Sequence, residues 1–215
     1  MEALAYQDAI ESGRFGLRAQ LMVSIDTIRD VVAHPDDAVT SAFTLGLRTG
    51  FGSYRLSLGA VKAWLDGGMM ARTAADLEIL VETACAAHAA GWQLALHAIG
   101  DRAIDVAIDI IETAQRRRPR ADARHHIEHC GLVRPDQLDR LAAAAITVVT
   151  QPTFLCVSGD DYSAVMGPNR AGWVYRGRTY LDRGIPIAGS SDRPVADGAP
   201  LRGIQFHGRA VVPAG

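Results

Sequence analysis

Four residues whose side chains can bind a metal ion or carry a proton stand at the ends of apolar stretches. They are Lys62 in "GAVKAWL", His97 in "LALHAIGD", His129 in "HHIEHC" and Asp192 in "GSSDRP". Histidine nitrogens and carboxylate oxygens are common ligands of zinc, and an aspartate can also act as a general base. Each residue alone has an ordinary structural role, but their recurrence at successive strand-like ends indicates one shared chemical site.

Lys62 is the only lysine among 22 lysine and arginine residues, and it lies in an apolar run with Ala60, Val61, Trp64 and Leu65. Apolar surroundings disfavour a charged amine and lower its pKa. A neutral amine can capture carbon dioxide as a carbamate, an anionic oxygen ligand, whereas the guanidinium of arginine stays protonated. A Schiff-base lysine, a general base and a lysine that extends into solvent from a strand end are the alternatives.

The run "RHHIEHC" contains three histidines. On a strand, alternation sends His125, Ile127 and His129 to one face and His126 and Glu128 to the other. His125 and His126 are therefore not both expected in the cluster that contains His129.

His97 and Asp192 also have ordinary explanations. A histidine after a strand is often capped or solvated, but here Gly100 allows close backbone approach and Asp101 begins a helix beside the imidazole. Asp192 can cap a turn before Pro194.

The elements that must position these residues alternate along the chain. Strand-like runs are predicted at 17–24, 56–65, 92–99, 124–130, 145–152 and 185–191. Helices are predicted at 74–90, 101–117, 135–144 and 171–183, with boundary signals at Thr73, Gly91, Asp101 and Pro135. Strands that are apolar at successive positions are typical of parallel strands covered on both faces. The pattern predicts an α/β fold with a parallel sheet.

Two architectures fit this pattern, an open doubly wound sheet and a barrel. No G-x-G-x-x-G motif follows a strand-like run, which argues against a dinucleotide-binding sheet. In a (β/α)8 barrel the carboxyl ends of all strands converge on one mouth, where active sites are built. The four strand-end residues therefore favour the barrel.

Composition limits the classes of function. A chain of 215 residues with 48% apolar residues has the size of one domain with a substantial core, and its formal charge of −2 argues against nucleic-acid and membrane-surface partners. The cysteines, Cys85, Cys130 and Cys156, are odd in number and far apart. We expect them to be small core side chains in a reducing, cytoplasmic compartment.

Five stretches resemble the amidohydrolase superfamily, and within it the YtcJ-like, amidohydrolase-3 group that includes N-substituted formamide deformylases. They are "LGAVKAWLDGGMMARTAA", "AAGWQLALHAIGDRAID", "RHHIEHCGLVRPDQL", "TVVTQPTF" and "IAGSSDRPV". These stretches occur in the family's order and cover almost the whole chain. The resemblance implies a partial metal-dependent hydrolase barrel of the (β/α)8 TIM type, comprising about strands three to eight.

The resemblance also implies roles for the four residues introduced above. Lys62 matches the carbamylated lysine of the family's fourth strand, and His97 and His129 match metal-ligand histidines of the fifth and sixth strands. Asp192 matches the eighth-strand aspartate, which binds metal and shuttles a proton. The implied cofactors are a divalent metal, zinc before others, and carbon dioxide as the carbamate on Lys62.

The sequence departs from the family in one important respect. Family members carry an H-x-H pair on the first strand, and no H-x-H occurs in these 215 residues. The stretch "MEALAYQDAIESGRFG" resembles the helix before strand three, and "FHGRAVVPAG" resembles a segment before the closing helices and β-sandwich. We expect residues 1–215 to form a single incomplete barrel domain, lacking strands one and two and the β-sandwich, as a fragment of a longer enzyme.

For the intact enzyme, the resemblance implies hydrolysis of a carbon–nitrogen bond in a small-molecule, amide-type substrate. Activated water would attack the carbonyl, and Asp192 would pass a proton to the leaving amine. Arg72, Trp173 and Tyr175 are secondary candidates for substrate contact, by residue type and position. The alternative is a catalytically inactive remnant that acts as a folding or interaction module. Unpaired strand edges also allow a homo-oligomer.

Overall fold

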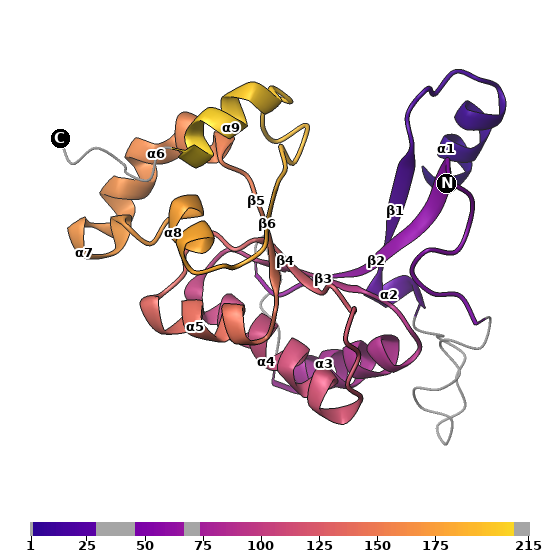
Figure 1. Cartoon of the computed structure of the whole chain (residues 1–215), viewed down its shortest axis with the longest axis horizontal. Helices are drawn as coiled ribbons and strands as arrows, with labels where there is room; N and C mark the ends of the chain where they lie inside the picture. Colours follow the sequence, from indigo (N-terminus) through magenta and orange to yellow (C-terminus); the bar gives the residue numbers. More distant parts are fainter. Residues whose placement is uncertain (1, 29–45, 67–73, 209–215) are drawn as a thin grey trace. The chain divides into compact units, whose positions relative to one another are not determined.

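The computed structural model describes residues 2–28, 46–66 and 74–208 (Figure 1). One sheet contains six strands, hydrogen-bonded in the order β1-β2-β3-β4-β5-β6. The strands are β1 (Ala19–Ser24), β2 (Leu56–Trp64), β3 (Leu94–Ala98), β4 (His126–His129), β5 (Thr147–Thr150) and β6 (Ile187–Gly189). Each strand lies within one of the runs predicted from the sequence, so the predicted strand pattern is confirmed.

The pairing of the strands is parallel, as the alternation with helices predicts. β1 pairs with β2, β4 with β5 and β5 with β6 in parallel register. The expectation that the strands are covered on both faces holds for β3, most of which is buried. It is wrong for β1, where Gln20 and Met22 are exposed while Leu21 between them is partly covered.

Helices separate most of the strands. They are α1 (Glu2–Glu11), α2 (Ile25–Ile28), α3 (Ala74–Ala89), α4 (Asp101–Arg117), α5 (Pro135–Ala143), α6 (Thr153–Met166), α7 (Pro168–Ala171), α8 (Gly177–Asp182) and α9 (Pro200–Gly208). α3, α4 and α5 confirm three predicted helices. No helix among the described residues is both long and apolar enough to cross a membrane.

The residues predicted to mark helix boundaries lie at helix ends wherever the structure describes them. α4 begins at Asp101, and Pro135 occupies the first turn of α5, where its missing N–H costs no hydrogen bond. Gly91 follows α3 with a φ of 97°, a left-handed conformation that glycine adopts without a Cβ clash. Thr73 lies outside the described residues.

The predicted helix at 171–183 is wrong over its first half. Only α8, Gly177–Asp182, and the end of α7 at Ala171 are helical. Between them, the N–H of Tyr175 donates to the carbonyl of Gly131 at 2.8 Å, and Val174 forms an isolated bridge with Leu132. The segment therefore pairs with the chain that follows β4, because these backbone groups find partners there and not in a helix.

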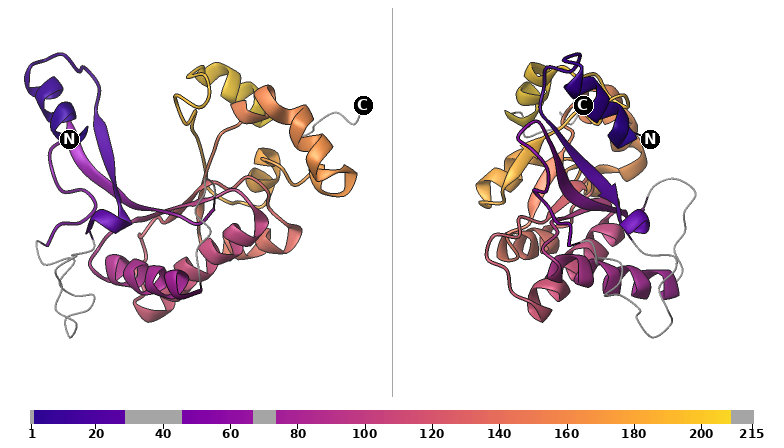
Figure 2. Two further views of the ribbon diagram at one scale, coloured as in Figure 1. Left: turned by 180° about the vertical axis from the view of Figure 1, so that it is seen from behind. Right: turned by 90° about the vertical axis from the view of Figure 1, so that its right-hand side faces the viewer.

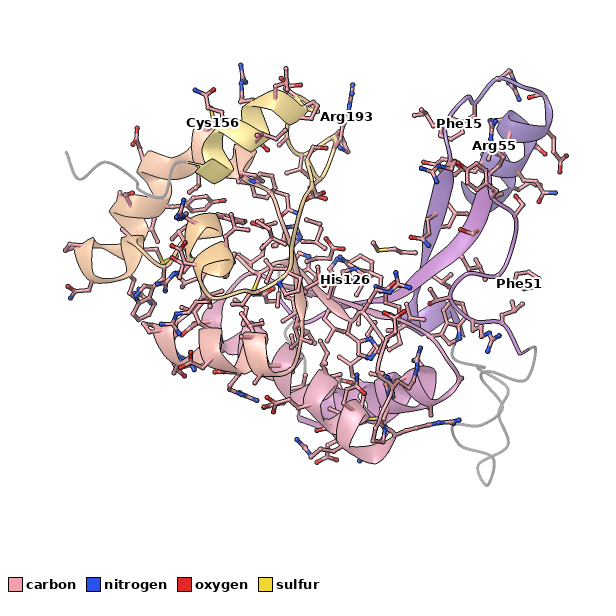
Figure 3. All side chains as sticks on the ribbon, viewed as in Figure 1. Phe15, Phe51, Arg55, His126, Cys156 and Arg193 are labelled. Carbon is pink, nitrogen blue, oxygen red and sulfur yellow. The ribbon has the colours of Figure 1, made fainter. Side chains whose placement is uncertain are left out.

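The prediction that the cysteines are core side chains is confirmed for Cys85 and Cys130, which are buried. Burial raises the pKa of the Cys130 thiol to about 12, which keeps this thiol protonated and unreactive. The prediction is wrong for Cys156, which is exposed on α6 (Figure 3). Cys156 follows Phe154 and Leu155 on a helix that the sequence pattern did not predict, so its exposed face was not expected.

The described contacts group the chain into two compact units. The first comprises Met1–Ala63, Arg72–Ala95 and Thr113–Ala123. In it, Arg120 donates to the carbonyls of His88 and Trp92, both at 2.8 Å, which ties the segment after α4 to the end of α3. In the same unit, the Arg55 guanidinium donates to the Phe15 carbonyl at 2.7 Å, and these two residues lie close together in Figure 3.

The second unit comprises Trp64–Ala71, Leu96–Glu112 and Arg124–Gly215. An ion-pair network joins α4 to α5 in this unit. Arg134 contacts Asp105 at 2.8 Å, and Arg140 contacts Asp109 at 2.6 Å and Glu112 at 2.8 Å. Elsewhere in the unit, α6 and α9 pack side by side (orange and yellow in Figure 2).

Asp105 makes the network sensitive to acid. Partial burial alone raises the pKa of Asp105, but hydrogen bonds from Arg134 and Gln137 and the positive charges of Arg134 and Arg140 outweigh it, so the net pKa is lowered from 3.8. A carboxylate with a lowered folded-state pKa stabilises the protein fully above its unfolded-state pKa. That stabilisation is lost as the pH falls through the lowered value.

We therefore expect Asp105→Asn to flatten the loss of stability below about pH 4. Urea unfolding measured across this range gives the slope of stability against pH for the wild type and the variant. Asp160→Asn, which changes an exposed carboxylate of α6, serves as the control. Equal slopes for the wild type and Asp105→Asn would contradict the assignment.

Candidate functional site

The predicted chemical residues lie at the carboxyl ends of the strands, as the sequence predicts. His97 is the next-to-last residue of β3, and His129 is the last residue of β4. Lys62 lies two residues before the end of β2, and Asp192 lies three residues beyond the end of β6. Parallel strands direct their carboxyl ends to one edge of a sheet, where α/β proteins build their active sites.

The structure brings His97 and His129 together. The centroids of the two imidazoles are 4.4 Å apart, and the ring planes meet at 70°. His129 is 6% exposed, and the His97 side chain is 13% exposed. The two imidazoles therefore lie side by side at the carboxyl ends of β3 and β4.

Gln151 favours one tautomer of the neutral His129 ring. Its amide nitrogen donates to the Val149 carbonyl at 3.3 Å, which leaves the amide oxygen facing His129 Nδ1 at 2.8 Å. An amide oxygen can only accept, so Nδ1 carries the proton and the lone pair of His129 is on Nε2. This is the arrangement by which an outer residue orients a metal-binding histidine.

Asp66 is a site residue that the sequence analysis missed. Its carboxylate lies 3.5 Å from His97 Nε2 and accepts the backbone N–H of Ile99 at 2.9 Å and of Gly100 at 2.6 Å. A Cβ at Gly100 would lie 3.2 Å from Asp66 Oδ2, which confirms that Gly100 permits a close approach. The available signal was a carboxylate shortly after β2, the same kind of strand-end position that identified the other residues.

Gln151 was also missed, although it follows β5 directly. A glutamine amide is not a usual zinc ligand and transfers no proton, so its residue type gave no signal. The signal that could have identified it is again its position at a strand end. Phe154, at the start of α6, stacks on His129 with ring centroids 6.2 Å apart.

Asp192 lies in an exposed turn. Its N–H donates to Ser190 Oγ at 3.3 Å, and its carbonyl accepts the N–H of Val195 at 2.8 Å. Among the described residues, no group of three or more His, Cys, Asp or Glu side chains is arranged to hold a metal ion. Asp192 therefore does not complete such a group with the two histidines there.

Lys62 belongs to the first compact unit, whereas the two histidines belong to the second. Its side chain is partly buried in β2, between the buried Val61 and Ala63, and it lies opposite Ser24 of β1. The apolar surroundings predicted from the sequence are therefore incomplete, and Trp64 is 40% exposed.

The three secondary candidates have different environments. Arg72 lies outside the described residues. Trp173 is partly buried against an apolar cluster of Leu132, Val174 and Tyr175, which is the ordinary packing role that the sequence left open. Tyr175 belongs to the same cluster, but its ring also meets Phe154 edge-on with centroids 5.8 Å apart.

The alternation predicted for "HHIEHC" is confirmed where it can be followed. His126 Nε2 and Glu128 Oε1 lie 3.1 Å apart, so these two buried side chains share one face of β4 (His126 is labelled in Figure 3). At the end of the strand, His129 and Cys130 have φ values of 70° and 50°. The left-handed backbone there ends the extended alternation, so the direction of His129 was not predictable from period two alone.

Left-handed backbone recurs around these residues. The non-glycine residues with positive φ include His129, Cys130, Tyr175 and Asp192, together with Arg124 and Ala145. Such conformations cost about 1–3 kcal/mol each and are concentrated at functional sites. Of these residues, His129 and Cys130 lie at the carboxyl end of β4, whereas Arg124 and Ala145 precede β4 and β5. The first two support the carboxyl end of β4 as the candidate site.

The donor set fits a divalent metal ion in part. His129 offers a lone pair on Nε2, and the ring of His97 lies beside the ring of His129. Catalytic zinc sites normally have three protein ligands, so two imidazoles need at least one further donor.

Solved structures show the same fold. A metal-dependent hydrolase of uncharacterized function from Pyrococcus furiosus superposes with a TM-score of 0.71 at 26% identity, over 93% of this chain and 42% of that one. A metal-dependent hydrolase from Pyrococcus horikoshii OT3 gives a TM-score of 0.71 at 25% identity, over 92% and 40%. The predicted fold class, a partial barrel of metal-dependent hydrolases with parallel strands, is confirmed.

Curated relatives are also similar in sequence. Protein LONG AFTER FAR-RED 3 of Arabidopsis thaliana is 30% identical over 74% of this chain. The putative amidohydrolase YtcJ of Bacillus subtilis is 26% identical over 94% of the chain. The N-substituted formamide deformylase of Arthrobacter pascens is 31% identical over 51% of it. The chain spans 30%, 38% and 20% of the lengths of these relatives, respectively.

The sequence profile described as "Amidohydrolase family" matches residues 4–207, which is most of the chain. The predicted YtcJ-like relationship is confirmed by the same set of similarities. The chain belongs to the amidohydrolase family.

Proposed function

We propose that the chain carries part of the active site of a metal-dependent amidohydrolase that cleaves a carbon–nitrogen bond in a small amide-type substrate. The observation that supports this most strongly is the His97–His129 pair, in which Gln151 holds the lone pair of His129 on Nε2. The relatives named as a putative amidohydrolase and as an N-substituted formamide deformylase support the bond type.

Each of the candidate site residues has a defined part in this proposal. By the family resemblance, His97, His129 and a carbamate on Lys62 would hold a divalent ion, for which zinc is the first candidate. The ion, when bound, supplies a water of lowered pKa and polarises the scissile carbonyl. The Asp192 carboxylate takes a proton from the attacking water and delivers it to the nitrogen of the leaving amine. Asp66 stabilises the loops after β2 and β3 and faces His97 Nε2.

A combined measurement of metal content and product tests this function. The purified chain is loaded with zinc in bicarbonate buffer, its bound zinc is measured by mass spectrometry, and amine release from N-formyl and N-acetyl amines is followed over long incubations. We expect bound zinc and a zinc-dependent release of amine that Asp192→Asn abolishes. A chain that retains no zinc after desalting would overturn the proposal.

The outer residue Gln151 gives a finer test. Gln151→Leu removes the acceptor that holds the His129 tautomer, so we expect the zinc affinity to fall about 10–100-fold. Gln137→Leu is a matched control, because Gln137 is equally buried and donates to the Asp101 carbonyl at 2.7 Å, on α4. An unchanged zinc affinity in Gln151→Leu, or an equal loss in both variants, would contradict the role of Gln151.

A further inference from the structure

The hydroxyl of Tyr175 is a buried polar group that the proposed function does not use. Tyr175 is 5% exposed, and its hydroxyl oxygen has no hydrogen-bond partner among the described residues. The neighbouring Tyr162 ring lies 5.9 Å away, centroid to centroid, and makes no hydrogen bond of normal geometry with it. A buried hydroxyl without a partner is destabilising, so its retention calls for an explanation.

The hydroxyl end of Tyr175 lies against the chain segments that follow both histidines. A Cβ built on Gly131, two residues after His129, would lie 3.4 Å from Tyr175 Cζ and 3.0 Å from Cγ2 of Ile99, two residues after His97. The Cζ atom carries the hydroxyl. Phe154 packs on the same ring and also stacks on His129. The hydroxyl therefore belongs to the immediate surroundings of the histidine pair.

The electrostatic environment keeps this hydroxyl protonated. Burial raises the pKa of Tyr175, and the nearby Tyr162, Asp192 and Asp66 raise it further. Tyr175 is thus a neutral hydrogen-bond donor at any physiological pH. Such a donor pairs with a carbonyl or carboxylate oxygen. An ammonium group would use only the lone pair of the hydroxyl oxygen and would leave the hydroxyl proton without an acceptor.

We propose that Tyr175 is a substrate-binding residue whose hydroxyl donates a hydrogen bond to the carbonyl oxygen of the amide and, after cleavage, to an oxygen of the carboxylate product. This inference rests on the proposed hydrolase function and names the residue that binds the oxygen. Phe154 and Tyr162 of α6 pack on the ring, so the proposal requires α6 to shift before a ligand reaches the hydroxyl. That helix is already broken at Ser158, whose φ of −135° is not helical.

Acetate, a carboxylate of the product class, is the probe for this inference. The zinc-loaded chain is titrated with acetate, and binding is followed by NMR for the wild type, Tyr175→Phe and Tyr180→Phe. We expect Tyr175→Phe to bind acetate about tenfold more weakly or worse, since a hydrogen bond to a charged group contributes that much. Its zinc content should equal that of the wild type.

Tyr180→Phe is the matched control, because the Tyr180 hydroxyl is also buried but donates to the Cys130 carbonyl at 2.9 Å. We expect Tyr180→Phe to lower the denaturant midpoint and keep the acetate affinity. Tyr175→Phe should keep or raise the midpoint, because it removes a polar group without a partner. This opposite pattern separates a ligand-binding role from a structural one.

The outcomes distinguish the inference from the function on which it rests. Loss of zinc binding by the wild type defeats the proposed function and, with it, the inference. A wild type that holds zinc but binds no acetate, or equal acetate affinity in Tyr175→Phe and the wild type, overturns the inference alone. A lowered midpoint in Tyr175→Phe without any change in acetate affinity also overturns it, since the hydroxyl would then be structural.

Discussion

Replacing Lys62 by arginine is expected to reduce the zinc bound by the chain from a stoichiometric amount to a trace. The proposed carbamate needs an amine that can lose its proton, and a guanidinium stays charged at neutral pH. Arginine would thus place a positive charge where an anionic oxygen ligand is required. Metal analysis after desalting, for proteins prepared in bicarbonate buffer, measures the difference.

Two further variants make the Lys62 prediction specific. Lys62→Ala should also lose zinc, and added propionate should restore part of it by supplying a carboxylate in place of the carbamate. Arg55→Ala is the control in the segment leading into β2, because the Arg55 guanidinium donates to the Phe15 carbonyl and is not among the proposed ligands. Equal zinc content in the wild type and Lys62→Arg would reject the carbamate role.

The second large effect concerns catalytic rate. The 215 residues by themselves should turn over amides at most in traces, far below the range of about 1–10³ per second that is typical of enzymes. The resemblance assigns a second metal position to an H-x-H pair, and none occurs in these residues. The proposed donors would suffice for one position only, so we expect the paired-metal centre to stay incomplete in these 215 residues.

Association should accompany the low rate. β1 and β6 stand at the two ends of the strand order, and each has a single neighbour among the described strands. Strand edges with unpaired backbone groups favour pairing with another copy. Size-exclusion chromatography of the purified chain, combined with the amine-release assay, checks both expectations. A monomer with turnover inside the enzymatic range would contradict them and show that one metal and Asp192 are enough.

The fold was predictable to the extent that it depends on local pattern. The strand runs, α3, α4 and α5 follow from apolar periodicity together with Gly91, Asp101 and Pro135, whose effects on the backbone are local. The segment before α8 was not predictable, because Tyr175 and Val174 pair with residues more than 40 positions earlier in the chain. Long-range backbone pairing overrides helical composition in such a segment.

The two neighbouring histidines of the candidate site could be selected from the sequence, but the residues that contact them could not. His97 and His129 could be selected because two imidazoles at successive strand ends indicate a shared metal site more strongly than either one alone. Asp66 and Gln151 could not be selected in this way, because they act through neighbouring groups. Asp66 accepts hydrogen bonds from two backbone N–H groups, and Gln151 sets the tautomer of His129. Such roles depend on distances that only the folded backbone defines.

The contact between Gly100 and Asp66 has an evolutionary consequence. A methyl group at position 100 would sit 3.2 Å from the Asp66 carboxylate, a separation that few real Cβ atoms show. Alanine at position 100 therefore requires the Asp66 carboxylate to move by a few tenths of an ångström. We expect changes at positions 66 and 100 to be coupled in evolution for this reason.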